Sequence, residues 1–151
     1  MVRIRRRPEA WVTAVAVIAA AIPGSAVRAL GPAGPAAHTS AAEQIVGGLW
    51  VAYRETQHAV EASDPEGIHQ GEAAIDEGLR ELEELRGLLP GSRQARTREL
   101  LDQGFVIVGA LHELADTERA SALAPLVRRL ETLIAEIQTM FRELGSAGVE
   151  V

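Results

Sequence analysis

The sequence predicts an all-α protein: an antiparallel up-down-up-down four-helix bundle preceded by a signal peptide and a short linker. Apolar residues recur at spacings of three and four along most of the chain, which is the period of a helix with one buried face. The composition is 47% hydrophobic but only 3% aromatic, and this favours packed Leu, Ile, Val and Ala side chains over a β-sandwich. Two segments with proline, at 63–66 and 90–92, divide the periodic pattern.

Residues 1–29 are predicted to be a signal peptide. A basic segment with Arg3 and Arg5–Arg7 precedes an uncharged, mostly apolar run from Trp11 to Ile22, and small residues follow at Pro23–Ala26. A helix of about twelve residues spans about 18 Å, which is short of the ~30 Å hydrocarbon core of a bilayer. We therefore expect export to the periplasm or the extracellular space. Retention of the uncleaved signal as a membrane anchor is the alternative.

Residues 30–39 are predicted to be a Pro/Gly/Ala linker, followed by a first helix over Ala41–Ala62. Ser40 and Glu43 have the spacing of a capping box, in which each side chain accepts a hydrogen bond from the other residue's backbone N–H. Several residues of this helix are expected to face the core: Ile45, Val46, Leu49, Ala52, Tyr53, Thr56, Ala59 and Val60.

A second helix is predicted from Pro65 to about Leu88, because Asp64 is a suitable N-cap and proline suits the first helical position. A third helix is expected over Arg93–Ala115, with Ser92 as its cap. The expected core residues of these two helices are Ile68, Ile75, Leu79, Leu82, Leu85, Leu89, Leu100, Leu101, Phe105, Ile107, Val108, Leu111, Leu114 and Ala115.

The fourth helix has the most regular apolar face of the chain. Pro125 lies early in it, so the helix either begins nearer Ser121 or kinks at the proline. Its apolar face consists of Leu123, Leu126, Val127, Leu130, Leu133, Ile134, Ile137, Met140, Phe141 and Leu144. Together the helices form a predicted bundle over residues 40–146, and residues 147–151 are expected to be a disordered tail.

Histidines and carboxylates are expected to gather at one end of this bundle. In an alternating bundle, the starts of the second and fourth helices share an end with the ends of the first and third. His58 and His69 each follow a glutamate at Glu-x-x-His spacing. Helical angles direct His58 outward and place His112 and Glu72 at the edge of the core.

These positions make His112, His69 and Glu72 candidate ligands for zinc, copper or nickel. The sequence requires no cofactor and does not identify one, although these residues could bind a divalent metal ion. The alternative is that His112 is a hydrogen-bonded histidine at the end of the core and that the other histidines are solvated.

A candidate partner surface lies on the first helix. Trp50 projects away from the main apolar stripe, with Val46 and Tyr53 on the same flank. An exposed Trp/Tyr/Val flank suits contact with a protein partner or a second copy of the chain. The alternative is that this flank packs against a neighbouring helix of the same bundle.

Composition narrows the functional classes. The chain has no cysteine, which excludes disulfides, thiolate metal sites and thiol catalysis. The net charge of −6, with five of the fifteen arginines in residues 1–29, argues against nucleic acid as a partner. No Ser–His–Asp arrangement or phosphate-binding loop is visible, so we do not expect an enzyme.

The predicted function is a non-enzymatic binding module in the cell envelope. The alternative is an exported metal- or cofactor-binding bundle with a histidine/carboxylate site at one end.

Overall fold

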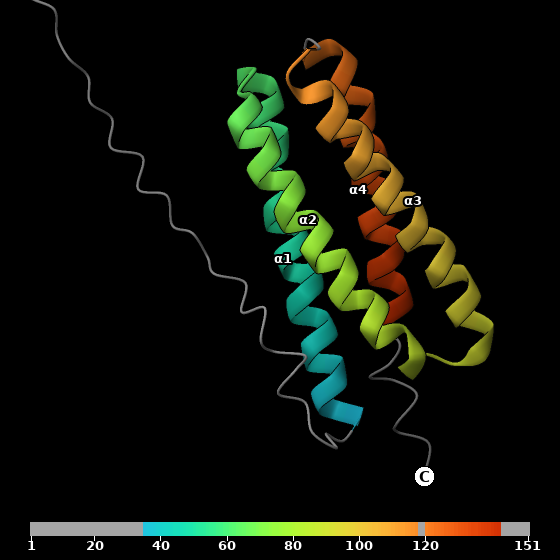
Figure 1. The fold of residues 1–151 in the computed structure, drawn as a ribbon. Helices are drawn as coiled ribbons and strands as arrows, with labels where there is room; N and C mark the ends of the chain where they lie inside the picture. The colour runs from blue at the N-terminus through green and yellow to red at the C-terminus, as the bar shows by residue number, and fades with distance from the viewer. Residues whose placement is uncertain (1–34, 118–119, 143–151) are drawn as a thin grey trace, which may run out of the picture.

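Four long helices pack side by side in the computed structural model, which describes residues 35–117 and 120–142 (Figure 1). Each helix packs against the next along the chain and α4 packs against α1, whereas no Cα atoms of the diagonal pairs α1/α3 and α2/α4 lie within 8 Å of each other among the described residues. The predicted all-α class with four packed helices is confirmed, and the contacts are consistent with an up-down bundle. The elements are α1 (Pro35–Ala62), α2 (Pro65–Leu85), the short 3-10 helix η1 (Arg86–Leu88), α3 (Gly91–Ala115) and α4 (Ala120–Arg142).

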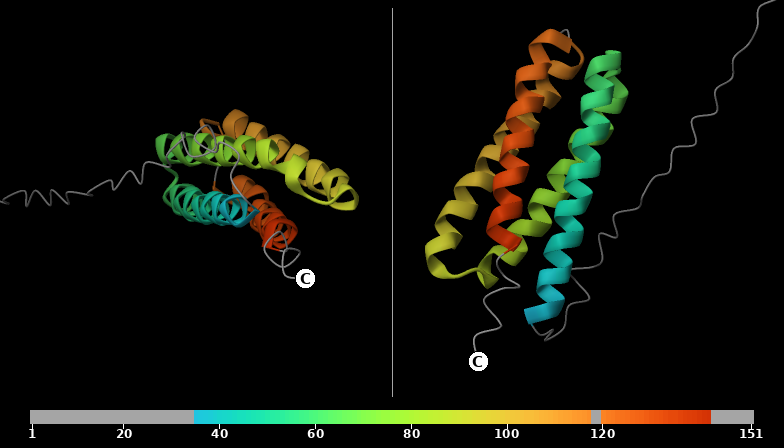
Figure 2. Two further views of the ribbon diagram at one scale, coloured as in Figure 1. Left: turned by 90° about the horizontal axis from the view of Figure 1, so that it is seen from below. Right: turned by 180° about the vertical axis from the view of Figure 1, so that it is seen from behind.

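The core lies between the four helices and follows the apolar periodicity. Seen from below, α2 and α3 lie on one side of it and α1 and α4 on the other (Figure 2). Every core residue predicted for the first two helices is buried. Of the core residues predicted for the last two helices, four are only partly buried and pack at the edge of the core: Phe105, Leu114, Leu126 and Met140. Full burial of one Leu or Ile contributes about 1.5–3 kcal/mol, so the apolar faces hold the helices together.

The first helix begins earlier than predicted. α1 starts at Pro35 rather than Ala41, so residues 35–39 belong to the helix and not to the predicted 30–39 linker. Ser40 consequently lies inside α1 and cannot cap it. The reason is local: proline is favoured in the first helical turn, and the alanines that follow it are the strongest helix formers.

The remaining boundaries are closer to expectation. Asp64 occupies the N-cap position of α2, although its side chain makes no capping hydrogen bond. α3 is capped by Pro90 rather than Ser92, and the Pro90 carbonyl accepts a hydrogen bond from the backbone N–H of Arg93 at 2.8 Å. α4 begins at Ala120, which leaves Pro125 inside the helix but near its start.

Glycines bring α1 and α2 close together. A Cβ atom at Gly71 would overlap Oγ1 of Thr56 and lie 3.3 Å from its Cα. A Cβ at Gly78 would lie 2.7 Å from Cδ2 of Leu49. Thr56 is fully buried and satisfies its hydroxyl by donating to the carbonyl of Ala52 at 2.8 Å. The small residues on α2 therefore set the distance between the two helices.

Several predictions concern residues outside the described ranges. The predicted signal peptide at 1–29, the linker up to residue 34 and the tail at 147–151 all lie there. Export therefore stays a prediction. Within the described residues, no helix combines the length and the apolar character that crossing a bilayer requires.

Candidate metal site

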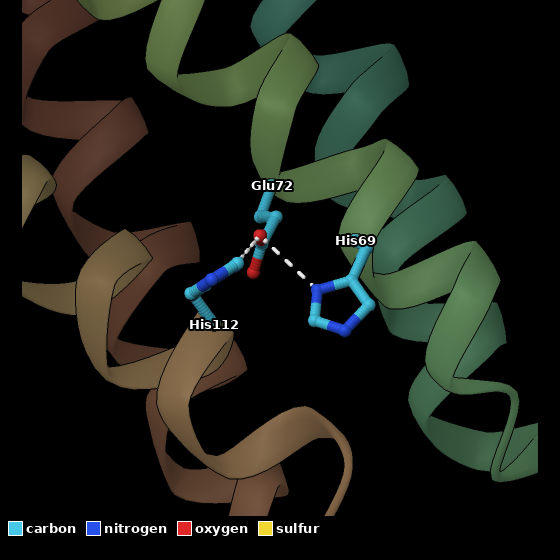
Figure 3. Close-up of side chains that lie close together, drawn as sticks. All are labelled: His69, Glu72 and His112. Atoms are coloured by element: carbon cyan, nitrogen blue, oxygen red, sulfur yellow. Dashed lines mark hydrogen bonds and ion pairs between the residues drawn. The ribbon is translucent and has the colours of Figure 1, made fainter.

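Three polar side chains meet at the end of the bundle where α2 begins and α3 ends (Figure 3). His69 and Glu72 are three residues apart on α2, a spacing that places two side chains on the same face of a helix. His112 reaches toward them from the last turns of α3. One ligating atom from each residue lies within 4.8 Å of the other two. The structure thus brings together the three residues that the sequence suggested as ligands.

Glu72 is at the centre of the cluster. Its Oε1 atom lies 3.2 Å from Nδ1 of His69 and is also within hydrogen-bonding distance of Nδ1 of His112 (Figure 3). The centroids of the two imidazole rings are 5.0 Å apart, and the ring planes are inclined by 60°. One carboxylate oxygen therefore faces ring nitrogens from two different helices.

The second oxygen of Glu72 has no such partners. Glu72 is only 6% exposed, and its Oε2 atom is buried without a hydrogen-bond partner among the described residues. Leaving a buried polar group unsatisfied costs about 1–3 kcal/mol, and more for a charged group. A bound cation is one partner that would offset this cost.

His69 lies between two carboxylates. Its Nδ1 faces Glu72, and its Nε2 lies 3.2 Å from Oδ1 of Asp116, the C-cap residue of α3. The hydrogen bonds to Glu72, first, and to Asp116 raise the pKa of His69 above its ordinary value of 6.5. Asp116 was not among the ligands predicted from the sequence. Its position at the end of α3, which is the same end of the bundle, was the signal that it could meet His69.

The cluster is open to solvent on the side of His112. The His112 side chain is 66% exposed, and a surface depression of about 360 Å³ lies beside it. A Cβ atom at Gly109 would meet nothing within 4 Å, so the helix leaves space there. The depression is lined by Glu72, Ala73, Asp76, Phe105, Val108, Gly109, His112 and Glu113. An ion held by the three side chains would remain accessible to small molecules.

The Glu-x-x-His spacings do not build the site. The His58 side chain is 82% exposed and faces away, as the helical angles predicted, and its ion-pair partner is Glu61 at 3.9 Å. Glu66 is also exposed. The spacing that contributes to the site is instead His69-x-x-Glu72, because both side chains lie close to His112 of α3.

The Trp50 flank is covered rather than exposed. Val46 and Tyr53 are buried, and Trp50 is partly buried with its Nε1 donating to Oε1 of Gln138 on α4 at 3.3 Å. Burial and the neighbouring Glu131 of α4 raise the pKa of Tyr53. The flank therefore packs against α4, which is the alternative predicted for it, and the expectation of an exposed flank is wrong for Val46 and Tyr53. Partner contact through these residues stays an untested prediction without an exposed flank to support it.

Comparisons of the chain with models of known protein families, with curated proteins and with solved structures found no match.

Proposed function

We propose that this protein binds one divalent transition-metal ion, of the zinc, copper or nickel kind, through His69, Glu72 and His112. The observation that carries the proposal is the buried Glu72 carboxylate, which has one oxygen between two imidazoles and the other without a partner. Imidazole nitrogen and carboxylate oxygen are common ligands for these ions. Export and the absence of enzymatic activity remain predictions, so the proposed role is a metal-binding module of the cell envelope.

The number of protein ligands argues for an exchangeable ion. Structural zinc sites are usually closed by four protein ligands, whereas sites with three leave a position for water or another molecule. The exposed side chain of His112 and the depression beside it are typical of a three-ligand site with an open position. We therefore propose that the ion is carried or presented to other molecules, and that the apolar core holds the fold without it.

A partner-binding surface at Trp50 has less support. The indole hydrogen bond to Gln138 and the burial of Val46 and Tyr53 give that flank a role within the bundle. An indole that already packs and donates inside its own chain offers little surface to a second protein.

Calorimetric titration of the full-length protein with Zn²⁺, Cu²⁺ and Ni²⁺ tests the proposal. The wild type is expected to bind one ion per chain, and His112→Ala is expected to lose most of the affinity for it. His58→Ala is the matched control, because it removes a histidine that is 82% exposed and makes no contact with the cluster. Equal losses in the two variants, or no binding by the wild type, would show that the proposal is wrong.

Metal affinity is expected to fall as the pH is lowered. The two carboxylates raise the pKa of His69, so in the metal-free protein its ring stays protonated to a higher pH than a free histidine. An ion must displace the proton from Nδ1, and binding therefore releases a proton and is strongest above the pKa of His69. Calorimetry at about pH 6 and about pH 8, in buffers of different ionisation enthalpy, measures both effects. The same affinity at both pH values would contradict this assignment.

A further inference from the structure

We infer that Asp116 is a positioning residue of the metal site, which orients His69 so that its Nδ1 atom faces the ion. This inference rests on the proposed function. Asp116 is not one of the three proposed ligands. It contacts the cluster through Nε2 of His69, the ring nitrogen that does not face Glu72.

The contacts of the imidazole carry the argument. On one side, Nδ1 lies 3.2 Å from Oε1 of Glu72; on the other, Nε2 lies 3.2 Å from Oδ1 of Asp116. A neutral imidazole that binds a metal through one nitrogen must carry its proton on the other nitrogen, and the partner of that second nitrogen decides which tautomer forms. An ionised carboxylate only accepts hydrogen bonds. With an ion bound between Nδ1 and Glu72, Asp116 therefore holds the proton at Nε2, and the Nδ1 lone pair faces the ion.

The helix geometry explains why this arrangement forms. His112 and Asp116 are four residues apart on α3, and His69 and Glu72 are three residues apart on α2, so each pair lies on one face of its helix. The α3 pair meets the α2 pair in order: His112 contacts Glu72, and Asp116 contacts His69. The backbone N–H of Asp116 bonds to the carbonyl of Leu114, which anchors the residue at the helix end. The end of α3 thus supplies one ligand and orients another.

If Asp116 only formed an ion pair with His69, replacing Asp116 would have a different effect on metal binding. An exposed ion pair between Asp116 and His69 contributes little to stability, and removing it would change unfolding slightly without a specific effect on metal binding. A carboxylate that orients a metal-bound histidine has a larger effect, because its loss typically lowers metal affinity about 10- to 100-fold.

Zinc titrations of the full-length protein and three variants separate these roles. Asp116→Ala is expected to bind zinc about 10- to 100-fold more weakly than the wild type. Asp116→Asn is expected to recover part of that loss, because the amide oxygen still accepts a hydrogen bond from Nε2. Glu113→Gln is the matched control: it removes one negative charge beside the depression at the same end of α3, and no contact joins Glu113 to His69 among the described residues. We expect its zinc affinity to stay close to that of the wild type.

Nitrogen-15 NMR of the imidazole rings supplies a readout that stability alone would not change. In the zinc-loaded wild type, His69 is expected to show a metal-bound Nδ1 and a protonated Nε2. Asp116→Ala is expected to lose this single pattern, whereas Glu113→Gln is expected to keep it.

The outcomes distinguish this inference from the proposed function. If His112→Ala abolishes zinc binding but Asp116→Ala binds as tightly as the wild type, the positioning role is overturned and the metal site stands. Equal losses for Asp116→Ala and Glu113→Gln would also overturn it, because charge alone would explain them. If the wild type takes up no zinc, the proposed function fails and this inference fails with it.

Discussion

Replacing Glu72 with leucine is expected to abolish metal binding and, at the same time, to make the metal-free protein more stable. Glu72 is the only charged side chain buried among the described residues, and its Oε2 atom lacks a partner. Exchanging buried ionic groups for apolar residues of similar volume is often neutral or stabilising, by about 1–4 kcal/mol. His69 and His112 are partly or largely exposed, so water can replace the carboxylate as their partner.

The affinity loss should exceed the roughly 10- to 100-fold expected for an outer contact such as Asp116, because Glu72 is a direct ligand. Glu72→Gln retains the shape of the side chain but not its charge, and it is expected to bind metal weakly as well. Urea unfolding in the presence of a chelator measures stability, and calorimetry measures affinity. Glu77→Leu, at an exposed position of the same helix, controls for the general effect of the exchange.

A lower stability for Glu72→Leu than for the wild type would contradict this prediction, because it would mean that the buried carboxylate stabilises the metal-free fold. The expected result, a gain in stability with a loss of binding, is the pattern of a residue kept for function at the expense of stability.

Replacing Gly71 with alanine is expected to destabilise the protein by about 1–3 kcal/mol, which is the usual cost of overpacking a core. The new methyl group would overlap Oγ1 of Thr56 and press on the backbone of α1. Thr56 is fully buried and its hydroxyl donates to the carbonyl of Ala52, so the side chain cannot rotate away without losing this hydrogen bond. α1 and α2 must therefore separate, and His69 and Glu72 on α2 would shift with them. Chemical unfolding followed by circular dichroism measures the change.

Gly47→Ala is the matched control for this prediction. A Cβ at Gly47 would meet nothing within 4 Å, and the residue is exposed in the interior of α1. Without a clash, only the higher helix propensity of alanine remains, and it should stabilise the protein by up to about 1 kcal/mol. The same substitution is thus expected to change stability in opposite directions at two positions. A similar change in both variants would show that Gly71 does not set the helix spacing.

The sequence by itself determined the four helices and their buried faces. Helical periodicity is a local property, since the spacing of residues such as Ile75, Leu79 and Leu82 fixes which of them share a face. Periodicity and the alternating directions of the helices also placed His69 and His112 at one end. Even the early start of α1 at Pro35 has a local cause that could have been recognised in the proline and alanines.

Only the tertiary structure decided how side chains from different helices meet. The contacts of Glu72 with His112 and of His69 with Asp116 join residues 40 and 47 positions apart, and they depend on the rotation and spacing of α2 and α3. The hydrogen bond between Trp50 and Gln138 likewise depends on where α4 lies. Each helix of a bundle faces two neighbours, so its buried surface is wider than the stripe that one periodic pattern marks, and side chains at the edge of that stripe are assigned only by packing.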